Sequence, residues 1–230
     1  MIRFKNFLKE SQWMYHGTTA SNVDSIKRNE GSPSTDRAVG AHFAADPEVA
    51  RKFSKGIHSS YASKGVVYKT RRPTRSELET VPQKKGHSDQ DSVDAHVLST
   101  VFSHPDHKHL FVKWHQSKFG STSDEANNVH EKLANKEYIP HDKKEYNYDK
   151  SRTNTFRSFV MHHGAYSGSG FGNRDLHKTI VNKFIDHMSS KGKKGLVYKN
   201  TNDKEIDGAD SNKSYIIFEP HKLKIERHND

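Results

Sequence analysis

The stretch MYHGTTASNVDSIKRNEG, residues 14–31, decides the fold into which the rest of the chain must fit. The aromatic residues before His16 are typical of a strand, and Gly17 marks the point where that strand ends. Beyond it, Ser21 can cap a helix whose apolar face includes Ile26. We therefore predict a strand that passes directly into a short helix, with a histidine and a glycine at the junction.

Other elements follow from capping signals and periodicity. Asp46 followed by Pro47 is an N-cap with proline in the first turn, which predicts a helix over residues 48–54. Strand-like alternation occurs in three runs, residues 65–72, 195–200 and 214–220. Strands thus gather at the two ends of the sequence, as expected if they pair with helices inserted between them.

The middle of the chain is of another kind. Residues 76–160 are rich in His, Lys, Asp and Asn, and their periodic apolar runs are helical. Apolar residues at helical spacing also predict a long helix over residues 176–192. We expect a single domain over residues 11–230 with a helical insertion at about 76–175.

Composition limits the classes of function. The 230 residues include no cysteine and carry a formal net charge of +10. Disulfides, thiolate zinc sites and cysteine nucleophiles are therefore excluded, and we expect a cytoplasmic location. No apolar run approaches the roughly 18 to 20 residues that span a bilayer, so we expect no membrane partner. The positive charge favours acidic partners such as nucleic acid, or is a solvated basic surface.

His16-Gly17-Thr18 is a candidate binding site. Glycine lets a ligand approach the backbone closely, and an imidazole can donate a hydrogen bond to a ribose hydroxyl. An exposed amide and carbonyl after a strand can pair with a carboxamide. The alternative interpretation is an ordinary turn with a surface histidine.

Three motifs in order give this site a family context. HGT at residues 16–18 is followed by GAHFAADPEVARKF at 40–53 and by SYIIFEP at 214–220. Together they resemble the ADP-ribosyltransferase superfamily, in its diphtheria-toxin and poly-ADP-ribose-polymerase branch, over about residues 13–72 and 193–226. The resemblance implies an α+β fold with two antiparallel sheets around a cleft, and NAD as the substrate.

The resemblance also assigns roles to individual residues. His16 matches the histidine that holds the nicotinamide-side ribose, Gly17 the backbone that grips the carboxamide, and Thr18 the hydroxyl beside them. His42 stands where the family has a tyrosine that stacks on nicotinamide. Phe53 matches the second stacking aromatic, or is an ordinary core residue of its helix.

The third motif departs from the family pattern. Ser214 stands where the family has its catalytic glutamate, so we count Ser214 among the residues that bind NAD. Glu205 or Asp207, in the loop before this strand, can supply the missing carboxylate, or are solvated loop charges. We take Glu205 and His16 as the candidate catalytic residues.

Two other segments of the sequence are candidate binding sites. HPDHKH, residues 104–109, gathers three histidines, which are common metal ligands. With 17 histidines in the chain, a chance cluster is the better explanation, and we predict no metal site. The glycine-rich SGSGFGN, residues 167–173, lacks the lysine of a phosphate-binding loop and is interpreted as a connector.

The N-terminal segment offers a separate indication of source. Leu8-Lys9-Glu10 before Ser11 resembles the cleavage signature of the T4-type phage prohead protease. Residues 1–10 are thus either an ordinary amphipathic helix or a cleaved capsid-targeting peptide.

The leading hypothesis is a phage-encoded mono-ADP-ribosyltransferase that transfers ADP-ribose from NAD to a host protein or nucleic acid. The alternative is an inactive internal head protein of the virion that keeps this fold and binds DNA or a host factor. The expected locations are the phage head interior and the host cytoplasm.

Overall fold

The computed structural model describes residues 12–18, 24–27, 39–54, 65–83, 89–137, 156–163, 174–199 and 213–228. It is a mixed α+β protein, as the sequence predicts. The chain divides into two compact units, one formed by residues 1–83 with 188–230 and the other by residues 84–187. The first is called here the sheet unit and the second the helical unit.

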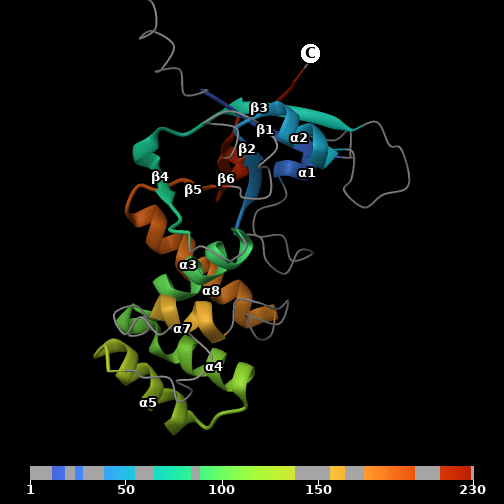
Figure 1. The fold of residues 1–230 in the computed structure, drawn as a ribbon. Coiled ribbons are helices and arrows are strands. Elements are labelled where there is room, and N and C mark those ends of the chain that lie inside the picture. Colours follow the sequence, from blue (N-terminus) through green and yellow to red (C-terminus); the bar gives the residue numbers. More distant parts are fainter. Residues whose placement is uncertain are drawn as a thin grey trace, which may run out of the picture. The chain divides into compact units, whose positions relative to one another are not determined.

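The sheet unit is built on one open sheet of seven strands in the order β4-β5-β6-β2-β1-β3-β7 (Figure 1). The strands are β1 (Trp13–Thr18), β2 (Ala41–Ala44), β3 (Val66–Arg71), β4 (Leu78–Thr80), β5 (Gly195–Lys199), β6 (Lys213–Ile217) and β7 (Glu226–Arg227). Around them lie α1 (Asp24–Lys27), α2 (Pro47–Ser54), η1 (Arg75–Glu77) and η3 (Pro220–Lys222). Strands β3 and β5 fall within the predicted runs 65–72 and 195–200, and β6 begins one residue before the run 214–220. β1 is the strand predicted to end at Gly17 and continues to Thr18.

The expectation of two facing antiparallel sheets differs from this arrangement. The described strands form a single hydrogen-bonded sheet, because β2 pairs with β1 on one side and with β6 on the other. The pair β4 and β5 is parallel, which requires a long crossover between them. The chain between these two strands is the helical unit.

Helix α2 begins as its capping residues predict. The backbone N–H of Glu48 donates to Asp46 Oδ1 over 2.7 Å, and Pro47 is the first helical residue. Buried Val49 and Ala50 on α2 pack with Tyr15 of β1 and Val67 of β3. A larger core covers the other face of the sheet and includes Met14, Ile26, Phe43, Tyr68, Tyr215 and Ile217.

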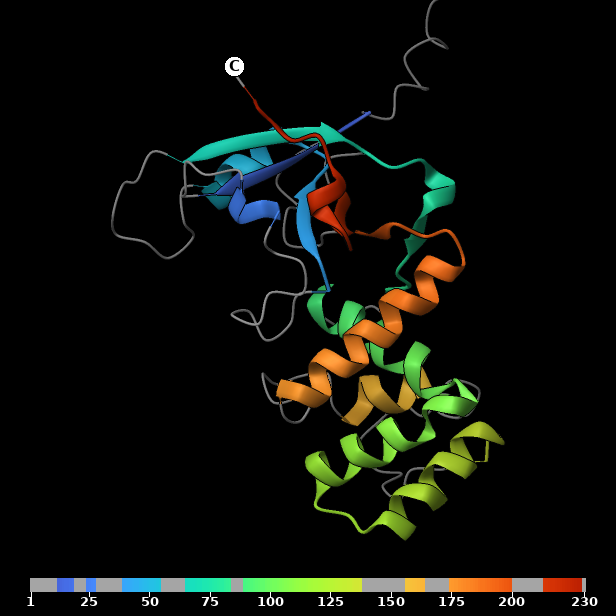
Figure 2. The same ribbon diagram turned by 180° about the vertical axis from the view of Figure 1, so that it is seen from behind.

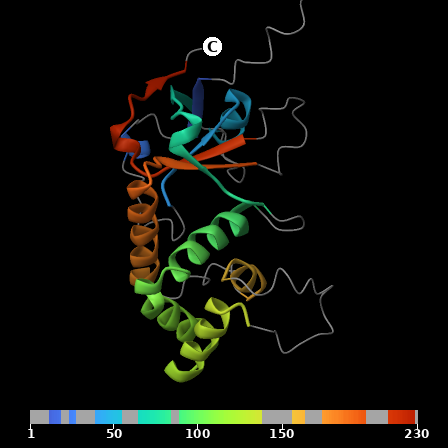
Figure 3. The ribbon, with the colours of Figure 1, turned by 90° about the vertical axis from the view of Figure 1, so that its left-hand side faces the viewer.

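The helical unit consists of α3 (Asp89–Phe102), η2 (Pro105–His107), α4 (Lys108–Phe119), α5 (Ser123–Ala134), α7 (Phe156–His163) and most of α8 (Arg174–Ser190). α4 and α5 pack side by side, and α3 packs on α7 (Figures 2 and 3). Its core is aromatic: Phe102, Phe111, Trp114 and Phe159 are all buried and in mutual ring contact.

Helix boundaries in this unit follow local signals. α8 agrees with the helix predicted over residues 176–192, and Gly192 after it has a left-handed φ of 72°. α5 begins with a capping box between Thr122 and Glu125. In the described part of the chain, no helix is long and apolar enough to cross a bilayer.

Candidate functional site

The hydrogen-bond ladder between β1 and β2 stops where the HGT motif begins. Among the described residues, the two strands pair at a single position, Tyr15 with Ala44. In Figures 1 and 2, β2 then runs away from β1 and β3 at a steep angle. If the ladder continued, the next hydrogen-bonded pair would be Gly17 with His42. We call this point, between Gly17 and His42, the strand break.

The direction of the backbone groups at the strand break follows from the neighbouring ladders. Arg72 N–H donates to the Gln12 carbonyl over 2.9 Å, so the even-numbered residues of β1 hydrogen-bond to β3. The N–H and C=O of Gly17, an odd-numbered residue, consequently point toward β2. Ala45 N–H donates to the Lys213 carbonyl over 2.9 Å, so by the same rule the N–H and C=O of His42 point toward β1.

His16 occupies the position of the missing ladder bond. Its Nδ1 lies 2.6 Å from the carbonyl oxygen of His42. Its ring also makes an edge contact with Phe43, with centroids 5.6 Å apart. The imidazole thus bridges β1 and β2 where the backbone no longer does, and Gly17 is left facing the break.

The same contact fixes the protonation of His16. A carbonyl oxygen only accepts, so Nδ1 must carry the proton. Desolvation by burial lowers the pKa of His16, although the bond to the His42 carbonyl acts in the opposite direction. The ring is therefore neutral at pH 7, and its Nε2 is an acceptor. We predicted from the sequence that this imidazole donates to a ribose hydroxyl; with the proton on Nδ1, its Nε2 can only accept a hydrogen bond.

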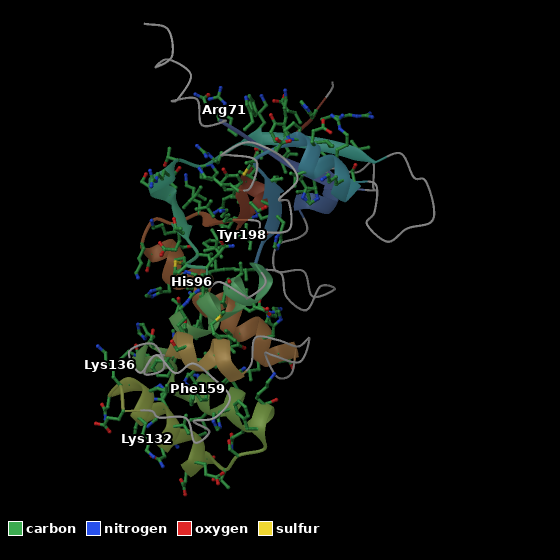
Figure 4. All side chains as sticks on the ribbon, in the orientation of Figure 1. Arg71, His96, Lys132, Lys136, Phe159 and Tyr198 are labelled. Atoms are coloured by element: carbon green, nitrogen blue, oxygen red, sulfur yellow. The ribbon has the colours of Figure 1, made fainter. Side chains whose placement is uncertain are left out.

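His42 lies on the opposite face of the sheet from His16. Its side chain is exposed, yet desolvation lowers its pKa to about 4, with nearby His16 as the second cause. Tyr198 of β5, which is labelled in Figure 4, contacts this ring, with its hydroxyl 3.4 Å from His42 Nδ1.

Ser214 shares that face with His42. It lies on β6, where its Cα is opposite Ala44 on one side and Tyr198 on the other. Its side chain is buried, at 5% exposure. The residue at the family's glutamate position is therefore beside the Tyr198 and His42 pair, but it brings a hydroxyl and not a carboxylate.

Gly17 is required by packing as well as by position. An added Cβ would lie 1.7 Å from the Ala50 carbonyl oxygen and 2.8 Å from the Ser54 nitrogen, both in the α2 backbone. The glycine therefore allows α2 to lie against β1, while its own peptide groups point along the sheet into the strand break. We predicted that Gly17 lets a ligand approach the backbone closely. On the face of the sheet covered by α2, the group that approaches Gly17 is the α2 backbone.

The remaining predicted residues are placed less completely. Thr18 ends β1 and is half-buried. Phe53 is in α2 beside Ser54, but its side chain lies outside the described residues, as do Glu205 and Asp207.

Two of the three histidines of HPDHKH lie together in the helical unit. The rings of His104 and His107 are 4.7 Å apart, and His187 contacts His104. Desolvation, and then the charge of His104, lower the pKa of His107. No group of three metal-ligating side chains was found among the described residues. Residues 167–173 and 1–10 lie outside the described part.

Sequence reasoning missed Tyr198. It stands in the predicted strand 195–200, and alternation alone would have placed it on one face with Leu196. Its partner, His42, is 156 residues away, so only the pairing of β5 with β6 and of β6 with β2 reveals the contact.

Comparison of the chain with protein-family models, with curated proteins and with solved structures found no match.

Proposed function

We propose that the strand break binds the nicotinamide end of NAD, and that the protein is a phage-encoded mono-ADP-ribosyltransferase acting on a host macromolecule. The observation that carries the proposal is the sheet order β6-β2-β1. It makes neighbours of the three strands that bear HGT, AHFA and SYII, although 195 residues separate the first from the last. This proximity is what a shared site requires.

The groups at the strand break are complementary to this ligand. The carboxamide of nicotinamide offers one carbonyl acceptor and an NH₂ donor, which match the N–H and C=O of Gly17. The neutral His16 can accept from a ribose hydroxyl through Nε2. His42 and Tyr198 add ring surface on the face that carries Gly17, and the α2 backbone next to Phe53 borders Gly17.

The reaction is a substitution at the ribose carbon that bears nicotinamide. The bond from that carbon to the ring nitrogen breaks, and its electron pair leaves with neutral nicotinamide. A bond to the acceptor nucleophile forms, and the acceptor loses a proton. Positive charge develops on the ribose as the bond breaks, and a carboxylate stabilises it. We assign that role to Glu205.

Ser214 supports a second candidate function. A buried hydroxyl at the family's glutamate position cannot stabilise this charge as a carboxylate does. If Glu205 does not supply it, the protein is an inactive virion protein that keeps the fold and binds DNA through its net positive charge.

Labelled NAD and host lysate separate the two functions. We expect the wild-type protein to transfer label to a host macromolecule and His16→Ala to lose both NAD binding and transfer. His109→Ala, an exposed histidine of α4 in the helical unit, is the matched control and should behave as wild type. Absence of transfer together with salt-sensitive DNA binding would instead support the virion protein.

A further inference from the structure

A pocket in the sheet unit is rich in cationic side chains. It has a volume of about 520 Å³ and is lined by residues from β4, β5, β6 and the segments before and after β4. Four cationic side chains line it, Arg72, Arg75, Lys199 and Lys213, and no acidic residue is among the described residues of its lining. We propose that this pocket binds the phosphate of a nucleotide-sized ligand.

The strongest indication is the pairing of two lysines across neighbouring strands. Lys199 of β5 and Lys213 of β6 are directly opposite in the antiparallel ladder. Phe218 N–H donates to the Lys194 carbonyl, so even-numbered pairs of these strands carry the hydrogen bonds. The two lysines are thus a non-hydrogen-bonded pair, in which side chains come closest. An anion between these two side chains can therefore interact with both ammonium groups at once.

The other cations are held at the same surface. Arg72 donates from Nη1 to the Tyr215 hydroxyl over 3.1 Å, and its guanidinium lies 5.7 Å from the centroid of that ring. Because Tyr215 and Lys213 are two apart on β6, they share a face. The guanidinium is therefore fixed on the side of the sheet that carries the lysine pair.

The glutamates near the pocket are engaged elsewhere. Glu77 forms an ion pair with Lys194, and hydrogen bonds from Lys194 and then Thr74 lower the pKa of Glu77 to about 2. Glu79 pairs with Lys193 over 3.6 Å, and as the residue between Leu78 and Thr80 it points to the opposite face of β4. Both carboxylates thus interact with lysines that do not line the pocket.

The size and mixed lining of the pocket indicate more than a simple ion. Leu78, Val81 and Val197 add apolar side chains to the lining that also carries the four cations. A volume in this range accommodates a small organic ligand. A ligand with a phosphate for the lysine pair and an apolar ring system for the apolar side chains fits both properties. This inference does not depend on the proposed reaction with NAD.

Calorimetric titration tests the pocket with four probes: inorganic pyrophosphate, AMP, a short single-stranded oligonucleotide with a 5′-phosphate, and the same oligonucleotide with a 5′-hydroxyl. We expect binding of AMP or of the 5′-phosphorylated oligonucleotide, which distinguishes a free nucleotide from a nucleic-acid end. The double variant Lys199→Ala, Lys213→Ala should weaken that binding about 100-fold or more. The loss of each charge-assisted hydrogen bond contributes about 10-fold, and the two factors multiply.

Lys191→Ala with Lys224→Ala is the matched control, because it removes the same charge from exposed positions of the sheet unit. Equal weakening by both double variants would overturn the proposal, since it would show a general charge effect. So would failure of the wild-type protein to bind any probe at millimolar concentration.

A further variant examines the chain's own carboxylates. The segment that joins the two lysines carries Asp203, Glu205, Asp207 and Asp210, and it lies outside the described residues. Neutralising all four, with Asn or Gln, should leave probe binding at least as tight as in wild type. Binding that appears only in this variant would contradict the proposal, because the pocket would then serve internal carboxylates.

Discussion

Replacing Gly17 by alanine tests the packing that positions the strand break. The new Cβ would lie 1.7 Å from the Ala50 carbonyl oxygen, half the 3.4 Å at which ordinary contact begins. The opposing atoms belong to the α2 backbone, which is anchored by buried Val49 and Ala50, so no side chain can move aside. We expect a loss of about 3 kcal/mol, at the upper end of the overpacking range, and a fall in Tm of about 10 °C.

Urea unfolding of the variant measures this loss. The two tryptophans report separately, because Trp13 is in the sheet unit and Trp114 in the helical unit, so Trp114→Phe leaves only the sheet unit visible by fluorescence. Gly192→Ala is the matched control, since its φ is 72° but no atom lies within 4 Å of the added Cβ. It should cost only about 1 kcal/mol. Equal stability of the two alanine variants would refute the close packing of α2 against β1.

Three further predictions concern the cap of α2, the two histidines of the strand break and Glu205. Asp46→Ala removes the cap of α2 and should lower the free energy of unfolding by about 1 kcal/mol, measured by urea unfolding; an unchanged midpoint would contradict the cap. The pKa values of His16 and His42 are lowered in the folded protein, so the unfolded chain binds protons first as the pH falls. The free energy of unfolding should be constant above pH 7 and should decline from about pH 6.5 toward about 4. The decline should be smaller in His42→Asn. Glu205→Gln should reduce transfer about 100-fold or more while NAD affinity stays within about twofold, whereas equal activity of this variant would remove Glu205 from the reaction.

Local signals were sufficient to predict much of the fold. The start of α2 is fixed by Asp46 and Pro47, and the end of α8 by a left-handed glycine, so both can be read from a few neighbouring residues. The capping box of Thr122 and Glu125 was also visible in the sequence, and it would have predicted α5. The α+β class is confirmed for the same reason, since it depends on the types of element and not on their pairing.

The features that depend on distant pairing could not be predicted. The parallel contact of β4 with β5 joins segments separated by the whole helical unit, and no local pattern reports it. The strand break exists only because β2 pairs with β6 and diverges from β1. Lys199 and Lys213 likewise look like two ordinary lysines until the β5–β6 register places them opposite each other.

The most direct test of the central claim is hydrogen exchange of the Gly17 amide, measured by NMR with and without NAD. The account predicts that Tyr15, which pairs with Ala44, is protected in the free protein, while Gly17 exchanges fast because its N–H faces the strand break. Saturation with NAD should then slow the exchange of Gly17 and leave Tyr15 unchanged. A Gly17 amide as protected as Tyr15 without NAD, or one whose exchange NAD does not alter, would contradict the account.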